Sequence, residues 1–287
     1  MKYRGFCFFI HFCFMAKKIN DSNRPLGIFD SGIGGLTVAS AINELLPKEQ
    51  IVYFGDTAHL PYGDKSPESI RKWAIAISDF LMTYDCKVIL IACNSISSVA
   101  YDLIKSHIGN KAIVINVIDP VVQYVCDQPK LKSIGVIGTK ATIKTDIYSK
   151  KIKGLKKSLN VSSLATPLLA PMIEEGFFNN KISKTIIHDY LSRPKLKGID
   201  SLILGCTHYP LIKPEIEQFY KSKITIFDTA RIVANYTKNM LETNNLLYTG
   251  KSKKHHFYIS DYTAAFAEST KLFFKGKVKL EHKNLWK

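Results

Sequence analysis

Two cysteines stand at matching places in the two halves of the sequence. Cys93 follows the apolar run 88–92, and Cys206 follows the apolar run 202–204 after a single glycine. Runs of this length and character predict buried strands. Polar side chains just past the ends of such strands lie where open α/β sheets bind their ligands. We therefore expect the two thiols to face each other across a cleft between two similar domains.

The six cysteines are not expected to share one role. None lies in a Cys-x-x-Cys pair, which argues against a zinc or redox site, and a chain of this length needs no disulfide framework. Cys86 and Cys126 are interpreted as small packing residues. A helix N-terminus lowers the pKa of a thiol from its free value of about 8.5. We therefore expect Cys93 and Cys206 to be available as thiolates near neutral pH.

Two reactions would use these thiols. In the first, His208 activates Cys206 as a nucleophile, as in a thiol hydrolase or amidotransferase, and Cys93 has no task. In the second, one thiolate removes a proton from a substrate Cα while the other thiol returns a proton on the opposite face. The stereocentre then inverts, and the two groups exchange roles in the reverse direction. Only the second reaction uses both cysteines.

Strand, loop and helix alternate along the chain, which favours an α/β fold with mainly parallel sheets covered by helices. The predicted strands are 26–29, 51–54, 88–92, 112–117, 133–137, 161–164, 202–204, 224–227 and 257–259. The predicted helices are 36–46, 67–84, one that begins at 142–148, one after Lys181 and one that ends near Leu241. Ser66 is the expected N-cap of the second helix, with Pro67 in its first turn.

Two loops between these elements can present backbone groups to a ligand. The glycine-rich loop 30–35 leads into a helix N-terminus and can offer N–H groups to an anion, but it matches neither a dinucleotide fingerprint nor a P-loop. The loop 55–63 contains Pro61 and Gly63 and can present Tyr62.

Composition narrows the class of protein. The chain has 287 residues, of which 46% are hydrophobic, and this is enough for a packed core. A formal net charge of +16 permits nucleic-acid binding. However, the lysine clusters are not interleaved with aromatic residues, as a nucleic-acid platform would require. We interpret the charge as a solvated surface and expect no nucleic-acid partner, with salt-sensitive nucleic-acid binding as the alternative.

Residues 1–23 contain a short apolar run that resembles part of a targeting segment. The apolar run 5–14 follows Lys2 and Arg4, as in a signal peptide, but no Ala-x-Ala cleavage site follows it. The run is also shorter than the roughly 20 residues of a membrane-spanning helix. We expect 1–23 to be a disordered extension or a misassigned start, with Met15 as the natural start, and we expect no membrane association.

Five stretches of this chain together resemble the signature stretches of the glutamate racemase family, in the family's order. They are DSGIGGLTV at 30–38, YFGD at 53–56, PYG at 61–63, ACN at 92–94 and LGCTHYPL at 204–211. The resemblance covers the chain from about residue 24 to its end. It implies a cytoplasmic racemase that needs neither pyridoxal phosphate nor a metal and makes D-glutamate for bacterial peptidoglycan. Members of the family are commonly homodimers.

The resemblance also implies roles for individual residues. Cys93 and Cys206 match the paired acid–base cysteines, and Asp30 matches the residue that assists the first thiol. Glu174 lies in a segment whose glutamate pairs with the histidine beside the second cysteine, here His208. The residues implied in substrate binding are Asp30, Ser31, Tyr62, Gly63, Asn94, Ser95, Thr207 and His208. Among them, Asn94, Ser95 and Thr207 would donate hydrogen bonds to the substrate and stabilise the carbanion in a closed, water-poor cleft.

This sequence departs from the family pattern at three places. Ser95 replaces the usual threonine and keeps the hydroxyl, whereas Ile96 replaces alanine and is expected to change the packing behind Asn94. His59 stands where the family often has arginine or asparagine. Glu175 is the alternative to Glu174 if the alignment is shifted by one residue.

The family architecture implies two pseudo-symmetric α/β domains with the active site between them. The first would comprise 24–116 plus 228–287, and the second 117–227. An aspartate racemase shares the two-cysteine chemistry and is the nearest alternative, followed by the thiol hydrolase described above.

Overall fold

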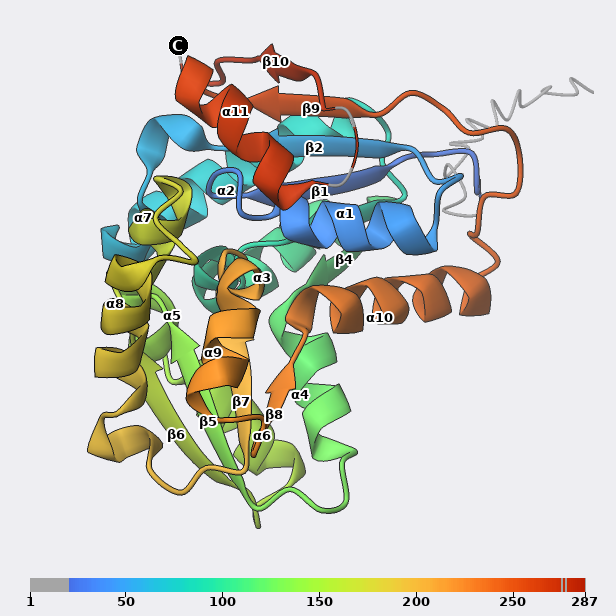
Figure 1. The fold of residues 1–287 in the computed structure, drawn as a ribbon. Coiled ribbons are helices and arrows are strands. Elements are labelled where there is room, and N and C mark those ends of the chain that lie inside the picture. The colour runs from blue at the N-terminus through green and yellow to red at the C-terminus, as the bar shows by residue number, and fades with distance from the viewer. Residues whose placement is uncertain (1–20, 275, 277, 287) are drawn as a thin grey trace, which may run out of the picture.

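The computed structural model describes residues 21–274, 276 and 278–286, which form an α/β fold with two mainly parallel sheets (Figure 1). This confirms the predicted fold class. The expectation for residues 1–20 lies outside the described residues. Within the described part of the chain, no helix is both long and apolar enough to cross a membrane.

The first sheet has six strands in the order β10-β9-β2-β1-β3-β4, and all of its pairings are parallel. The strands are β1 (Leu26–Asp30), β2 (Ile51–Gly55), β3 (Val88–Ile91), β4 (Ile113–Asn116), β9 (His256–Ile259) and β10 (Leu280–His282). Segments from both ends of the described chain therefore pair in one sheet.

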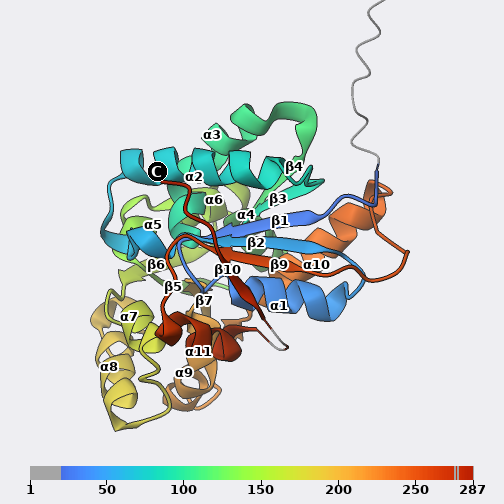
Figure 2. The same cartoon turned by 90° about the horizontal axis from the view of Figure 1, so that it is seen from above.

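Helices cover both faces of this sheet, because its central strands are apolar on both sides. The helices are α1 (Leu36–Leu45), α2 (Pro67–Met82), α3 (Asn94–Ile108), α10 (Thr229–Thr243) and α11 (Ala264–Phe273). Figure 2 shows α2 and α3 on one side of the sheet and α1 and α11 on the other. Neighbouring residues of β1 face opposite cores, since Ile28 packs with the α1 side and Phe29 with the α2 side. Ser66 caps α2 as predicted, because its hydroxyl accepts a hydrogen bond from Ser69 N at 3.2 Å.

The second sheet has four strands in the order β6-β5-β7-β8, again all parallel. The strands are β5 (Ser133–Gly138), β6 (Asn160–Ala165), β7 (Ser201–Gly205) and β8 (Thr225–Phe227). The helices between β4 and β8 are α4 (Ile118–Cys126), α5 (Lys140–Lys144), α6 (Ile147–Leu155), α7 (Leu169–Glu174), α8 (Lys181–Leu191) and α9 (Lys213–Phe219). Figure 1 shows this sheet below the first, with α3 and α10 between them.

The sequence pattern missed several short elements. The helix expected to begin at 142–148 is two helices, α5 and α6, which meet at Asp146 in a left-handed conformation (φ 54°). α4, α7, α9, α11 and β10 were not predicted. α7 and α9 have only six and seven residues, which is too short for a clear helical periodicity.

Candidate active site

Cys93 and Cys206 line one small cavity of about 40 Å³ between the two sheets. Cys93 directly precedes α3, two residues after β3, and Cys206 directly follows β7. The complete lining is Ser31, Leu60, Pro61, Tyr62, Gly63, Cys93, Asn94, Ser95, Thr139, Ala170, Pro171, Glu174, Gly205, Cys206, Thr207 and His208. The structure therefore brings together every sequence-predicted site residue except Asp30.

The Cys93 thiol is buried and stays protonated in this environment. Its side chain is 5% exposed, and its Sγ donates to Ser31 Oγ at 3.5 Å. Burial, followed by the nearby Asp30 carboxylate, raises the pKa of Cys93 to about 12. The hydroxyl of Ser31 and the N–H of Ile96 oppose this rise, but they do not outweigh it. The prediction of a Cys93 thiolate near neutral pH is therefore wrong, because burial destabilises the thiolate more than the groups at the helix N-terminus stabilise it.

Cys206 has a different neighbour, the imidazole of His208. Nδ1 of His208 lies 3.5 Å from Cys206 Sγ, and its Nε2 forms an ion pair with Glu174 Oε1 at 2.8 Å. Burial by itself lowers the pKa of His208, but the hydrogen bonds to Cys206 and Glu174 outweigh it and hold that pKa well above the ordinary range. The ion pair with Glu174 favours the protonated form of His208, whose Nδ1–H can then donate to the sulfur, while Nε2 contacts the carboxylate without a regular hydrogen bond. Cys206 does not stand at an α-helix N-terminus, since a short 3₁₀ turn, Tyr209–Ile212, follows it.

Asp30 ends β1 and lies behind the cavity wall. It is fully buried, and its Oδ2 accepts hydrogen bonds from Gly32 N at 3.1 Å and Gly35 N at 2.9 Å. Its Oδ1 has no hydrogen-bond partner within the described part of the chain. Burial raises the pKa of Asp30, while the charge of His208 and the two backbone N–H groups oppose the rise. Asp30 thus fixes the shape of the glycine-rich loop and places a carboxyl group near the Cys93 side of the site.

The polar groups of the lining are held by contacts between the two sheets. Tyr148 of α6 donates its hydroxyl to Asn94 Oδ1 at 2.7 Å, so the Asn94 amide N–H₂ remains for a ligand. Ser95 Oγ lies 2.9 Å from Thr139 Oγ1. On the opposite wall, the Thr207 carbonyl accepts a hydrogen bond from Thr37 Oγ1 at 2.9 Å. The cavity therefore presents amide and hydroxyl donors from both sides.

Thr139 is a lining residue that sequence reasoning missed. It stands between β5 and α5, as the N-cap whose hydroxyl accepts from Thr142 N at 3.3 Å. Its place just after the strand-ending Gly138 is the signal that would have found it, because Cys206 also follows a strand-ending glycine.

Of the three residues at which the sequence departs from the family pattern, Ser95 lines the cavity, whereas Ile96 and His59 lie away from the lining. Ile96 is fully buried in the core beneath α3, and His59 pairs with Asp56 at 2.7 Å. Glu175 is exposed, whereas Glu174 contacts His208, so the structure places Glu174 and not its neighbour in the site. Tyr62 lines the cavity, and its hydroxyl donates to Asp56 Oδ2 at 2.5 Å.

Comparison with known proteins gives a consistent picture. Residues 31–237 match the family model described as Asp/Glu/Hydantoin racemase. The glutamate racemase of Chlorobaculum parvum is 41% identical over 253 residues, which covers 88% of this chain and 93% of that protein. The crystal structure of glutamate racemase from Francisella tularensis in complex with D-glutamate has a TM-score of 0.86 and 38% identity, covering 92% of this chain and 99% of that one. The aspartate racemase of Picrophilus torridus shares only the fold, with 16% identity and a TM-score of 0.55 over 87% of this chain and 99% of that one.

Proposed function

Because this chain belongs to the Asp/Glu/hydantoin racemase family and, within it, to the glutamate racemases, we propose that it interconverts L- and D-glutamate with Cys93 and Cys206 as the two acid–base groups. The observation that carries this proposal is that the two thiols line one cavity and are supplied by different sheets. A Cα held between them would have a sulfur on each face. The Francisella complex supports glutamate as the substrate of the group to which the chain belongs.

The proposed reaction begins with an ionised thiol on one wall and a protonated thiol on the other. The thiolate takes the Cα proton, and the opposite thiol gives its proton to the other face of the carbanion. The Asn94 amide and the hydroxyls of Ser95 and Thr207 donate hydrogen bonds that stabilise negative charge on the substrate carboxylate. We propose that these donors, in place of a cofactor, stabilise the carbanion while each proton moves between Cα and sulfur.

The two thiols would be ionised by different partners. On the Cys206 wall the imidazolium of His208, held by Glu174, compensates negative charge on sulfur. On the Cys93 wall, Asp30 and Ser31 are the nearby groups, and burial together with the Asp30 carboxylate raises the pKa of the thiol. We infer that Cys93 is the proton donor of the resting enzyme, and that Cys93 becomes ionised only when a substrate ammonium group lies beside Asp30.

The proposed domains follow the two sheets. We propose that 24–116 plus 228–287 form one domain and 117–227 the other, since β9 and β10 pair with the first sheet and β5 to β8 form the second. The cavity is small beside a glutamate molecule, so we propose that the walls separate to admit the substrate and close again over it. We further propose that the enzyme is a cytoplasmic homodimer that supplies D-glutamate for peptidoglycan.

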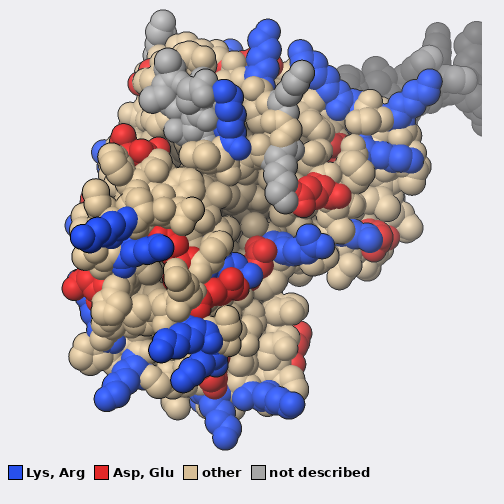
Figure 3. Space-filling model, viewed as in Figure 1, with Lys and Arg blue, Asp and Glu red and all other residues tan. Residues whose placement is uncertain are grey.

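Nucleic-acid binding finds no support on the face drawn in Figure 3. Lys and Arg side chains are scattered over it, with Asp and Glu among them, and they do not form a continuous basic stripe. We therefore propose that the protein binds glutamate and has no nucleic-acid partner.

The decisive test is proton exchange at Cα. Purified protein incubated with L-glutamate in D₂O, without added pyridoxal phosphate, is expected to abolish the circular dichroism of the amino acid and to place deuterium at Cα of both enantiomers. We expect kcat/KM for aspartate to be lower by about 10²-fold, because each polar contact that a shorter side chain leaves unmade costs affinity in the transition state.

Two results would contradict the proposal. Faster exchange with aspartate than with glutamate would indicate an aspartate racemase. An acyl-enzyme on Cys206 without any Cα exchange would indicate a thiol hydrolase, the alternative that the close approach of Cys206 and His208 favours.

Replacing Glu174 by glutamine is expected to shift the pH dependence. The carboxylate that pairs with His208 disappears, so the pKa of His208 falls and the alkaline limb of kcat/KM moves to lower pH. We expect kcat/KM at pH 8 to fall by about tenfold, less than the 10²–10⁴ of a group that carries the proton itself. Glu175→Gln, at the exposed neighbouring position, is the matched control and should leave the profile unchanged.

Glu174→Gln is also expected to lower the free energy of unfolding by an amount that depends on pH. Because the pKa of His208 is raised on folding, its contribution is fully present below the unfolded value of about 6.5 and is lost as pH rises through the folded value. The free energy of unfolding should therefore differ more between wild type and Glu174→Gln at pH 6 than at pH 10. Urea titrations at both pH values measure this, and an equal difference at the two would show that the ion pair does not raise the pKa.

A further inference from the structure

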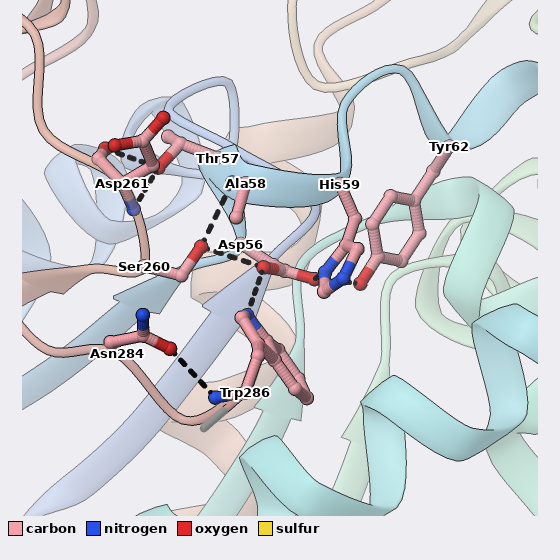
Figure 4. A network of polar contacts seen from close by, with 9 residues as sticks. All are labelled: Asp56, Thr57, Ala58, His59, Tyr62, Ser260, Asp261, Asn284 and Trp286. Carbon is pink, nitrogen blue, oxygen red and sulfur yellow. Dashed lines mark hydrogen bonds and ion pairs between the residues drawn. The ribbon is translucent and has the colours of Figure 1, made fainter.

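Asp56 joins three separate segments of the chain behind the Tyr62 side of the cavity. It follows β2 directly and is fully buried. Its Oδ2 accepts from Tyr62 Oη at 2.5 Å and pairs with His59 Nδ1 at 2.7 Å. Its Oδ1 accepts from Ser260 Oγ at 2.6 Å and from Trp286 Nε1 at 3.0 Å (Figure 4). Four donors thus surround one carboxylate that carries no cavity-lining atom itself.

Ring packing repeats the same connection. His59 stacks on Trp73 with ring centroids 4.0 Å apart and an interplanar angle of 18°. The Trp286 ring also packs edge-on against His59, with centroids 4.7 Å apart and an angle of 73°. Tyr62 also packs against Trp73, at 5.2 Å. Trp286 is therefore joined to the Tyr62 loop twice, through Asp56 and through His59.

The loop 56–63 depends on such contacts because it has little regular structure of its own. It contains two short 3₁₀ turns, Thr57–His59 and Tyr62–Asp64, and no strand pairing. Ser260 Oγ also accepts from Ala58 N at 2.9 Å, so the segment after β9 holds the beginning of the loop (Figure 4). The end of the loop, Tyr62 and Gly63, lines the cavity. Asp56 N also donates to Asp30 O at 3.1 Å, but the rest of the loop is held chiefly through side chains. Such a loop transmits the loss of one contact to the residues it presents.

We propose that Trp286 is a positioning residue for glutamate racemisation, which holds Tyr62 and Gly63 in place through Asp56 and His59. This inference rests on the proposed function for its substrate. The Trp286 indole N–H lies 230 positions along the chain from the carboxylate that accepts it. Burial and the Asp56 carboxylate hold the pKa of Tyr62 well above its ordinary range. The Tyr62 hydroxyl therefore keeps its proton and continues to donate to Asp56. His59, the unusual residue of the loop, supplies the ring on which Trp286 rests.

Two substitutions at Trp286 separate the hydrogen bond from the packing. Trp286→Phe keeps an aromatic ring against His59 but lacks the N–H, and Trp286→Ala loses both. We expect KM for D-glutamate to rise by about threefold in Trp286→Phe and by about tenfold in Trp286→Ala, the scale of a lost hydrogen bond to a buried carboxylate. kcat should change by less than about twofold, because the thiols and His208 are untouched. Lys279→Ala, an exposed change in the same part of the chain, is the control and should leave both constants unchanged.

A second readout does not depend on activity. Amide hydrogen exchange of 57–65 should be faster in both Trp286 variants, while exchange of β7 and α3 stays as in the wild type. The proposal is overturned if loop exchange and KM stay unchanged, or if exchange rises while KM does not, which would leave Trp286 a merely structural role. It is also overturned if kcat falls as much as KM rises. Failure of the proposed function itself would be visible separately, as a wild-type protein that does not racemise glutamate although the variants loosen the loop.

Discussion

Alanine in place of either Cys93 or Cys206 is expected to remove glutamate racemisation, with a loss of about 10⁴-fold in kcat, the upper range for one acid–base group. Each thiol lines one wall of the cavity, so its removal leaves one face of the bound Cα without the group proposed to carry its proton. The loss must be the same in both directions, because inversion needs both faces. Cys126→Ala is the control, since that thiol is partly buried beside α6 and away from the cavity, and it should keep full activity.

Isotope exchange makes this prediction sharper. A variant with one remaining thiol can still remove the proton on that side and return a deuteron to the same face. In D₂O, we therefore expect Cys93→Ala to exchange the Cα hydrogen of one enantiomer only, and Cys206→Ala to exchange that of the other only, both without inversion. Exchange of the same enantiomer by both variants, or full racemisation by either, would refute the assignment of one thiol to each face.

The positions of the two thiols could be predicted because they depend on local pattern. An apolar run that ends in a cysteine is visible in the sequence, and parallel strands place such residues at one edge of each sheet. Glu174 and His208 were predicted to pair from the resemblance alone, and their nitrogen and oxygen lie 2.8 Å apart in the structure. A short distance between residues on α7 and after β7 has no local signature, so only knowledge of related proteins could supply it.

The state of Cys93 could not be predicted, because it depends on how much water the fold removes. The sequence shows a thiol before a helix, whereas the structure adds nearly complete burial and the carboxylate of Asp30. The link between Asp56 and Trp286 was missed for a related reason. It joins residues 230 positions apart, and the sequence around either residue contains no pattern that indicates the other as its partner. Side-chain contacts between distant segments follow from tertiary packing, which no periodicity records.

Alanine in place of Gly34 is expected to have the second-largest effect, a loss of about 10²-fold or more in kcat/KM, which is the scale of a displacement of about 1 Å in a catalytic group. Gly34 lies in the loop between β1 and α1 and touches the opposite wall. A Cβ built on it would stand 2.5 Å from His208 Nδ1 and 2.6 Å from Thr207 Oγ1. Because its backbone is not in the left-handed region, the cost is the close approach and not backbone strain.

The atom that a methyl group at Gly34 would displace, His208 Nδ1, is the one that contacts Cys206. His208 Nδ1 lies 3.5 Å from Cys206 Sγ, and a methyl group at Gly34 must push it away or hold the two walls apart. If His208 moves alone, exchange should slow most for the enantiomer that Cys206→Ala fails to exchange. If the walls are held apart, exchange of both enantiomers should slow together. Single-turnover exchange of each enantiomer in D₂O therefore distinguishes a local from a global displacement.

Gly154→Ala is the matched control for this substitution. Gly154 lies in the last turn of α6, and a Cβ there would meet no atom within 4 Å. Alanine should therefore raise the free energy of unfolding by up to about 1 kcal/mol, through the higher helix propensity of alanine, and leave kcat/KM unchanged. A Gly34→Ala enzyme with wild-type activity would show that Thr207 and His208 can shift without consequence, and the role proposed for the imidazolium at Cys206 would have to be abandoned.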